Sequence, residues 1–289
     1  MSTESDARIY DRGYRPYDGP RSGVQGAVRS VGLQSLRRAL GLRRPLWAKL
    51  PPALIIGLAF IPALVYVGIG AILSDIDADV IPAYSDYYAV LAAALLLFVA
   101  WTAPEILCPD RRTGMLGLYF ASPLSRSTYL LAKFSAIGAV LLAITLGPVV
   151  FLAIARGLIG DGPGVGDLPL LALRMIVTGV VLALLYGLLG AAISALIDRR
   201  AIATAAVILF VLAVGAATST MIRVAEYPAW INVFDLPTLG TDVVSVIWNT
   251  NTDLATELEP WAVVVAAMAW IAGCVVIIWA RYRRIEVTR

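Results

Sequence analysis

Six long apolar runs constrain what this chain can fold into more than any other feature of its sequence. Each run holds roughly twenty residues or more, the length a helix needs to cross about 30 Å of hydrocarbon. Of the 289 residues, 60% are hydrophobic, more than a soluble domain needs for its core. We therefore predict an all-α polytopic membrane protein. The predicted spans are residues 53–73, 87–104, 129–155, 170–197, 201–222 and 261–280.

The charges between the runs alternate in sign and indicate the orientation of the chain. Residues 75–86, between the first two spans, carry only acidic charges, and residues 223–260 carry six acids against one arginine. The loops of the other side are rich in arginine. Because basic loops stay in the cytoplasm, this alternation predicts six spans with both termini cytoplasmic.

Two segments precede the six-span domain, which we assign to residues 51–289. Residues 1–22 are polar, and we predict that they form a cytoplasmic arm. This arm is either a disordered tail or an extended segment that packs on a partner through its tyrosines. Residues 23–50 combine apolar residues at helical spacing with basic residues and no acid. This pattern predicts an amphipathic connecting helix on the membrane face, or alternatively a plain solvated helix. The arginines expected to bind anionic headgroups are Arg29, Arg37, Arg38, Arg43 and Arg44.

The composition argues against several functions. A net charge of +3 gives no support for a nucleic-acid partner, and the absence of histidine removes the commonest metal ligand and proton shuttle. The glycine-rich residues 160–166 lack the Lys-Ser/Thr pair of a phosphate-binding loop, so we expect no ATP site on this chain. No carboxylate is expected at mid-span, which argues against an ion-coupled carrier and an intramembrane hydrolase. We expect no catalytic residue, metal site or cofactor on the chain itself.

Small residues recur at every fourth position on two of the predicted spans. The fourth span carries Gly179, Ala183, Gly187, Ala191 and Ala195, and the fifth nearly repeats the pattern with Ala201, Ala205, Ala213 and Ala217. Such stripes let helix backbones approach closely. They predict tight packing within one bundle or, alternatively, against a second copy.

A polar segment interrupts the apolar sequence between the second and third spans. Residues 105–133 read EILCPDRRTGMLGLYFASPLSRSTYLLAK, with charges, glycine, proline and serine. Lipid cannot satisfy the polar groups of an irregular segment, so we predict a loop over residues 105–128. Within it we expect a short amphipathic helix at MLGLYF, a turn at ASPLSR and a new helix from near Ser127.

This segment resembles the coupling region of the membrane subunit of ABC exporters of the second permease class, also called type V. In that family a Glu at the cytoplasmic end of the second span precedes a basic, Gly-containing segment. An apolar stretch, a Ser-Pro-Leu-Ser turn and a Lys entering the third span follow. The resemblance covers residues 105–133 closely and the six-span layout loosely. Its positions are Glu105, Arg111, Arg112, Gly114, Leu116, Ser122, Pro123, Leu124, Ser125 and Lys133, and Arg126 completes the expected coupling loop.

The resemblance implies a permease subunit without its own ATP site, in a bacterial cytoplasmic membrane. The implied partners are two copies of an ABC ATPase subunit, which bind ATP and Mg, and a second membrane subunit, identical or homologous. It also implies that the second and fifth spans line a central apolar cavity for a lipophilic or amphipathic substrate. The residues that bind the substrate are not identified. The alternatives are a non-transporting membrane scaffold or assembly protein and, third, a secondary transporter.

Two further features leave alternatives open. Glu105 is either an interfacial carboxylate solvated by water or a buried partner of Arg111, Arg112 or Lys133. The long 223–260 connection is either an outer loop resting on the interface or, as the resemblance implies, a re-entrant helical hairpin broken at Pro228 and Pro237.

Overall fold

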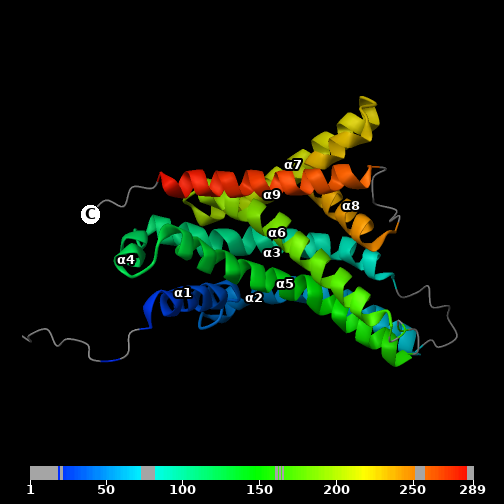
Figure 1. Ribbon diagram of the computed structural model, residues 1–289, viewed down its shortest axis with the longest axis horizontal. Helices are drawn as coiled ribbons and strands as arrows, with labels where there is room; N and C mark the ends of the chain where they lie inside the picture. The colour runs from blue at the N-terminus through cyan, green and yellow to red at the C-terminus, as the bar shows by residue number, and fades with distance from the viewer. Residues whose placement is uncertain are drawn as a thin grey trace, which may run out of the picture.

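The computed structural model describes residues 22–72, 82–159, 166–250 and 258–284, together with Gly19, Gly162 and Gly164. All regular structure in these residues is helical (Figure 1). Nearly all of the predicted N-terminal arm and most of the acidic connection between the first two spans lie outside the described residues. The helices are α1 (Gly23–Ala39), α2 (Leu46–Ile72), α3 (Tyr84–Arg112), α4 (Leu116–Ala121), α5 (Arg126–Ile159), α6 (Leu168–Leu196), α7 (Arg200–Val224), the 3-10 helix η2 (Ala229–Phe234), α8 (Leu236–Trp248) and α9 (Pro260–Arg283).

Six of these helices, α2, α3, α5, α6, α7 and α9, are long and apolar enough to cross a membrane. They coincide with the six predicted spans, so the prediction of a multi-pass, all-helical protein is confirmed at this level. Each helix extends beyond its predicted apolar run at one end or at both. The largest extension is at the C-terminal end of α3, which continues from the predicted end at residue 104 to Arg112.

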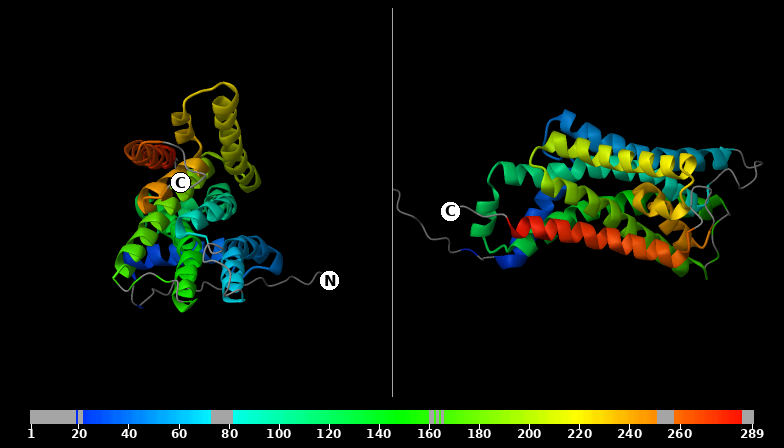
Figure 2. Two further views of the ribbon diagram at one scale, coloured as in Figure 1. Left: turned by 90° about the vertical axis from the view of Figure 1, so that its right-hand side faces the viewer. Right: turned by 90° about the horizontal axis from the view of Figure 1, so that it is seen from above.

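The spans differ strongly in how much of their surface the bundle covers. Helices α3 and α6 are the most buried, whereas α2, α7 and α9 are largely exposed. Helix α3 packs against α2, α5, α6 and α7, and it lies between α2 and α7 at one side of the bundle (Figure 2). The exposed faces of α2, α7 and α9 are apolar, as expected for helices surrounded by lipid.

The glycine stripe of α6 explains its close contact with α5. A Cβ atom at Gly179 would lie 2.8 Å from a methyl carbon of Leu146, and one at Gly187 would lie 3.0 Å from Leu141. These distances leave no room for a larger residue, so this stripe packs within the bundle. The alanine stripe of α7 is different, because Ala201, Ala205, Ala213 and Ala217 are all exposed.

The basic segment before the first span is not one continuous helix. Helix α1 ends at Ala39, a turn follows, and α2 begins at Leu46, within the residues 23–50 assigned to the connecting helix. The turn uses Gly41 at φ +65°, where a side chain would also strike the carbonyl group of Ala48. Helix α1 packs along α5 and contacts α3. Its buried positions are Val31, Ser35 and Ala39, and of the apolar residues at helical spacing only Val31 is among them, whereas Val24 is exposed.

The 223–260 connection contains helical structure that packs into the bundle. Pro228 directly precedes η2, and Pro237 lies in the first turn of α8, where its missing N–H costs no hydrogen bond. Helix α8 packs against α3, α6 and α9, and the indole of Trp248 donates a hydrogen bond to the Thr178 hydroxyl at 3.1 Å. Tyr227 and Trp230 remain exposed.

Helix α1, helix α4 and the C-terminal end of α9 lie at the same end of the bundle (Figure 1). The ends of α3, α6 and α9 and the starts of α5 and α7 meet there, as the alternating direction of the spans requires. We call this the basic end, defined by the arginines that gather there: Arg37, Arg38, Arg43, Arg44, Arg111, Arg112, Arg126, Arg199, Arg200, Arg281 and Arg283.

Candidate functional site

The candidate site is the α3–α4–α5 connection at the basic end. The predicted loop of residues 105–128 begins later than expected, because residues 105–112 still belong to α3. The prediction failed because it assumed that the polar side chains of these residues exclude a buried helix, whereas the fold satisfies them with ion pairs. Helix α3 ends at Arg112, and Gly114, two residues later, has φ +69° and donates its N–H to the Arg111 carbonyl.

The turn before α5 has a capping box at its helical end. The Thr128 N–H donates to the Ser125 hydroxyl at 3.2 Å, and the Ser125 N–H donates to the Thr128 hydroxyl at 2.8 Å. These reciprocal bonds satisfy two donors that a helix start leaves open. Helix α5 therefore begins at Arg126, one residue before the predicted start.

Helix α4 has a buried face and an exposed face. Leu116 and, just after the helix, Leu124 are buried, and the ring of Phe120 packs edge-on against Tyr129 of α5 at 6.0 Å. Burial, and secondarily the Asp110 carboxylate, raise the pKa of Tyr119, which keeps its hydroxyl protonated. The opposite face carries Leu118, which is 67% exposed. The other exposed residues between positions 112 and 123 are Arg112, Thr113, Gly114, Met115, Ala121 and Pro123. Ser122 is half-buried and donates its hydroxyl hydrogen bond to the Tyr119 carbonyl.

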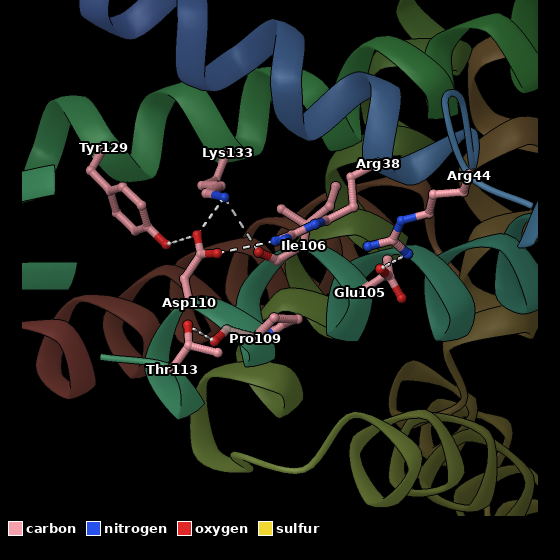
Figure 3. Close-up of polar contacts among 9 residues, drawn as sticks. All are labelled: Arg38, Arg44, Glu105, Ile106, Pro109, Asp110, Thr113, Tyr129 and Lys133. Carbon is pink, nitrogen blue, oxygen red and sulfur yellow. Dashed lines mark hydrogen bonds and ion pairs between the residues drawn. The ribbon is translucent and has the colours of Figure 1, made fainter. Parts of the chain in front are cut away.

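Asp110 lies at the centre of a buried charge cluster between α1, α3 and α5 (Figure 3). Its carboxylate pairs with Lys133 at 2.6 Å and with Arg38 at 3.1 Å, and it accepts a hydrogen bond from the Tyr129 hydroxyl at 3.0 Å. The side chains of Asp110 and Lys133 are each only 3% exposed. Sequence reasoning missed Asp110. The sequence did contain a signal. Asp110 and Glu105 are the two acids among many basic residues in this segment, so Asp110 was a candidate for an ion pair.

Glu105 is buried, but its partners are not those predicted. Its carboxylate pairs with Arg44 at 2.5 Å and also with Arg200 at the start of α7. The prediction of a pair with Arg111, Arg112 or Lys133 is wrong. On a helix, positions 105 and 111 lie on different faces, and Lys133 forms its ion pair with Asp110 instead. The Arg200 guanidinium also stacks 4.2 Å from the ring centre of Trp101.

Arg111 ties the end of α3 to the end of α6. Its guanidinium donates hydrogen bonds to the carbonyl oxygens of Ser194, Ala195 and Ile197, and it lies 3.5 Å from the Asp198 carboxylate. The last carbonyls of a helix lack partners within the helix and carry partial negative charge, so a cation is favourable there. Arg111 is therefore an internal contact, whereas its neighbour Arg112 is exposed.

The arginines predicted to bind membrane headgroups divide into two groups. Arg29, Arg37 and Arg43 are exposed. Arg38 and Arg44 are only partly exposed, and they pair with Asp110 and Glu105 within the chain. An unpaired buried carboxylate costs much free energy, whereas water can solvate an arginine at the surface, so the ion pair is favoured.

Comparison of the sequence with protein-family models and with curated proteins finds no match. Among the described residues, no three potential metal-binding side chains come together, and Cys108 and Cys274 are free thiols. The chemical content of the basic end is therefore charge and exposed apolar surface. Such an arrangement is chemically suited to binding a partner.

Proposed function

We propose that this chain is the membrane subunit of an ABC exporter in a bacterial cytoplasmic membrane, with the basic end and both termini in the cytoplasm. Two copies of a separate ATPase subunit would bind ATP and Mg, and a second membrane subunit, identical or homologous, would complete the transporter. The proposal extends the resemblance of residues 105–133 to the coupling region of that family.

The observation that carries the proposal is that α4 exposes an apolar side chain, while the end of α3 just before it is fixed by buried ion pairs. Helix α4 exposes Leu118 at the basic end, and Arg112 and Met115, in the residues just before this helix, are also exposed. An apolar residue rimmed by polar ones is typical of a surface that binds a protein. Behind this surface, the last two turns of α3 are connected by charged side chains to α1, α5, α6 and α7.

These connections suggest how motion of the ATPase would reach the spans. Closure of the ATPase pair around ATP would push α4. A flexible loop would absorb this push, but α4 follows α3 after three residues, and α3 is held at Asp110, Glu105 and Arg111. The push would therefore move α3 together with α5, α6 and α7, and change which side of the membrane the transport path faces.

The exposed helices α2 and α7 are the proposed contact with the second membrane subunit. They flank α3, and the alanine stripe of α7 lies exposed. Small residues permit close helix packing in lipid. The transport path between the two subunits would be apolar, because α3 and α7 offer mostly apolar side chains. This favours a lipophilic or amphipathic substrate.

The proposal is tested by isolating the tagged protein from its native membranes in a mild detergent and identifying the proteins bound to it. We expect a stoichiometric ABC ATPase and ATP hydrolysis that vanadate inhibits. A monodisperse protein without an ATPase in several detergents would instead favour a membrane scaffold. Transport that depends on a proton gradient and not on ATP would favour a secondary transporter.

Two variants address the α3–α4–α5 connection directly. Gly114→Pro replaces a residue at φ +69° with one whose ring fixes φ near −65°, so it redirects the chain between α3 and α4. Arg112→Glu reverses an exposed charge beside α4. We expect both proteins to insert in the membrane, with at least tenfold less bound ATPase in each, measured by quantitative immunoblotting after isolation. Wild-type amounts of ATPase on both variants would contradict the assignment.

A further inference from the structure

A groove at the basic end is lined by residues of α5, α6, α9 and the turn before α5, and by no described residue of α2 or α7. It runs between α5 and α9, which both pack against α6, and has a volume of about 980 Å³. Leu188 of α6 lines its base. The two walls converge at the basic end, where the rings of Tyr129 and Tyr282 lie 6.3 Å apart.

The groove is apolar along its length and basic at its mouth. Leu130, Leu131 and Phe134 of α5 face Val275 and Ile278 of α9 across it. At the mouth lie Arg126, Arg283 and the hydroxyls of Ser125 and Ser127, and the described residues that line the groove include no carboxylate. The positive end of the α5 dipole adds to the two guanidinium charges.

The two arginines are positioned by contacts of their own. The Arg126 guanidinium donates a hydrogen bond to the Arg283 carbonyl at 2.7 Å, which joins the start of α5 to the end of α9. The Arg283 guanidinium lies 5.0 Å from the ring centre of Trp279, whose side chain is 58% exposed. Arginine and tryptophan together are typical of the depth at which lipid headgroups lie.

We propose that this groove binds one anionic glycerophospholipid of the leaflet at the basic end. Its phosphate would lie against Arg126 and Arg283, within reach of the serine hydroxyls, and an acyl chain would occupy the apolar length towards Phe134 and Leu188. Lipid is the molecule available to fill the groove, because the groove lies between two membrane-spanning helices. The volume is also within the roughly 300–1,000 Å³ of typical ligand pockets. The proposal does not depend on an ATPase partner.

The test is lipid titration of the purified full-length chain in mild detergent, followed by native mass spectrometry. The probes are phosphatidylglycerol and phosphatidylcholine with the same acyl chains. We expect a clear preference for phosphatidylglycerol. A basic residue near a membrane surface contributes enough binding energy for roughly a fivefold change, so Arg126→Gln combined with Arg283→Gln should weaken phosphatidylglycerol binding roughly thirtyfold.

The matched control is Arg281→Gln, because Arg281 is exposed on the same helix and does not line the groove. Ser135→Trp fills the apolar part of the groove and should weaken binding of both lipids, while thermal unfolding in detergent verifies that the variants fold. Wild-type preference in the Arg126/Arg283 double variant, or an equal loss in Arg281→Gln, would overturn the proposal.

Two other occupants give distinct results. If inorganic phosphate binds with the same dependence on Arg126 and Arg283 while the two lipids bind equally, the groove is a free-phosphate site and the lipid proposal fails. If the wild-type chain is dimeric and Ser135→Trp makes it monomeric, a second copy occupies the groove, and the proposal fails as well.

Discussion

Two carboxylates on one helix, five positions apart, hold different parts of the bundle. Asp110 joins α3 to α1 and α5, and Glu105 joins it to the α1–α2 turn and to α7. Burying a charge is costly unless an opposite charge and hydrogen bonds compensate it. These pairs therefore matter mainly because they fix the position of the end of α3. Removing one partner would leave the other buried without an opposite charge.

We therefore predict that Asp110→Asn lowers the free energy of unfolding strongly. The amide keeps the size of the side chain but leaves the Lys133 ammonium buried without its counter-charge, which we expect to cost about 3–5 kcal/mol of unfolding free energy. Replacing Lys133 by Met in the same protein should recover most of the loss, because it removes the uncompensated charge. The measurement is unfolding in sodium dodecyl sulfate followed by circular dichroism.

Asp198→Asn is the matched control for that series. Asp198 also pairs with an arginine, but its side chain is 60% exposed, so water compensates its charge. We expect a change below about 0.5 kcal/mol. Equal destabilisation by the two Asp→Asn substitutions would show that the buried cluster does not hold α3.

At the residue scale, sequence reasoning succeeded where the cause is local. The serine turn before α5 follows from backbone rules that act within a few residues, whereas the end of α3 at Arg112 was not predicted. The partners of Glu105 could not be found in this way, since Arg44 and Arg200 are far from it in the chain. Several arginines near the basic end are compatible with one carboxylate, and only the packing of the helices selects among them.

At the scale of elements, Arg111 connects α3 to the turn between α6 and α7. We predict that Arg111→Met speeds amide hydrogen exchange about tenfold or more in residues 197–202, because the ends of the two helices lose several charge-assisted hydrogen bonds. Arg112→Met, at the adjacent exposed position, should leave this exchange unchanged. Hydrogen exchange measured by mass spectrometry in detergent distinguishes the two, and identical profiles would refute the role of Arg111.

The elements themselves were predictable to different degrees. The six spans follow from the length of their apolar runs, because lipid demands such runs. Their ends do not, since Glu105 and Asp110 lie inside α3 only because neighbouring helices supply cations. Helix α8 contains Pro237 and Gly240, and its burial depends on contacts with α3 and α6 that the local sequence does not reveal.

At the scale of the whole molecule, the charge asymmetry predicts which end faces the cytoplasm. The native cysteines are buried, so single exposed cysteines can report the orientation in whole cells with a membrane-impermeant maleimide. Arg223→Cys, at the end of the molecule opposite the basic end, should react in intact cells. Arg112→Cys should react only after the membrane is opened. The reverse pattern would place the basic end outside and separate the surface of α4 from the proposed cytoplasmic ATPase.

The measurement that tests the central claim most directly is the amount of ABC ATPase bound by Leu118→Asp. Leu118 is the exposed large apolar side chain of α4, and a buried aspartate at the centre of an interface should reduce ATPase binding at least tenfold. The control is Leu158→Asp, which places the same charge at an exposed leucine near the opposite end of α5. Our account predicts loss of the ATPase from Leu118→Asp alone. Equal amounts of ATPase on the wild-type protein and both variants would contradict it.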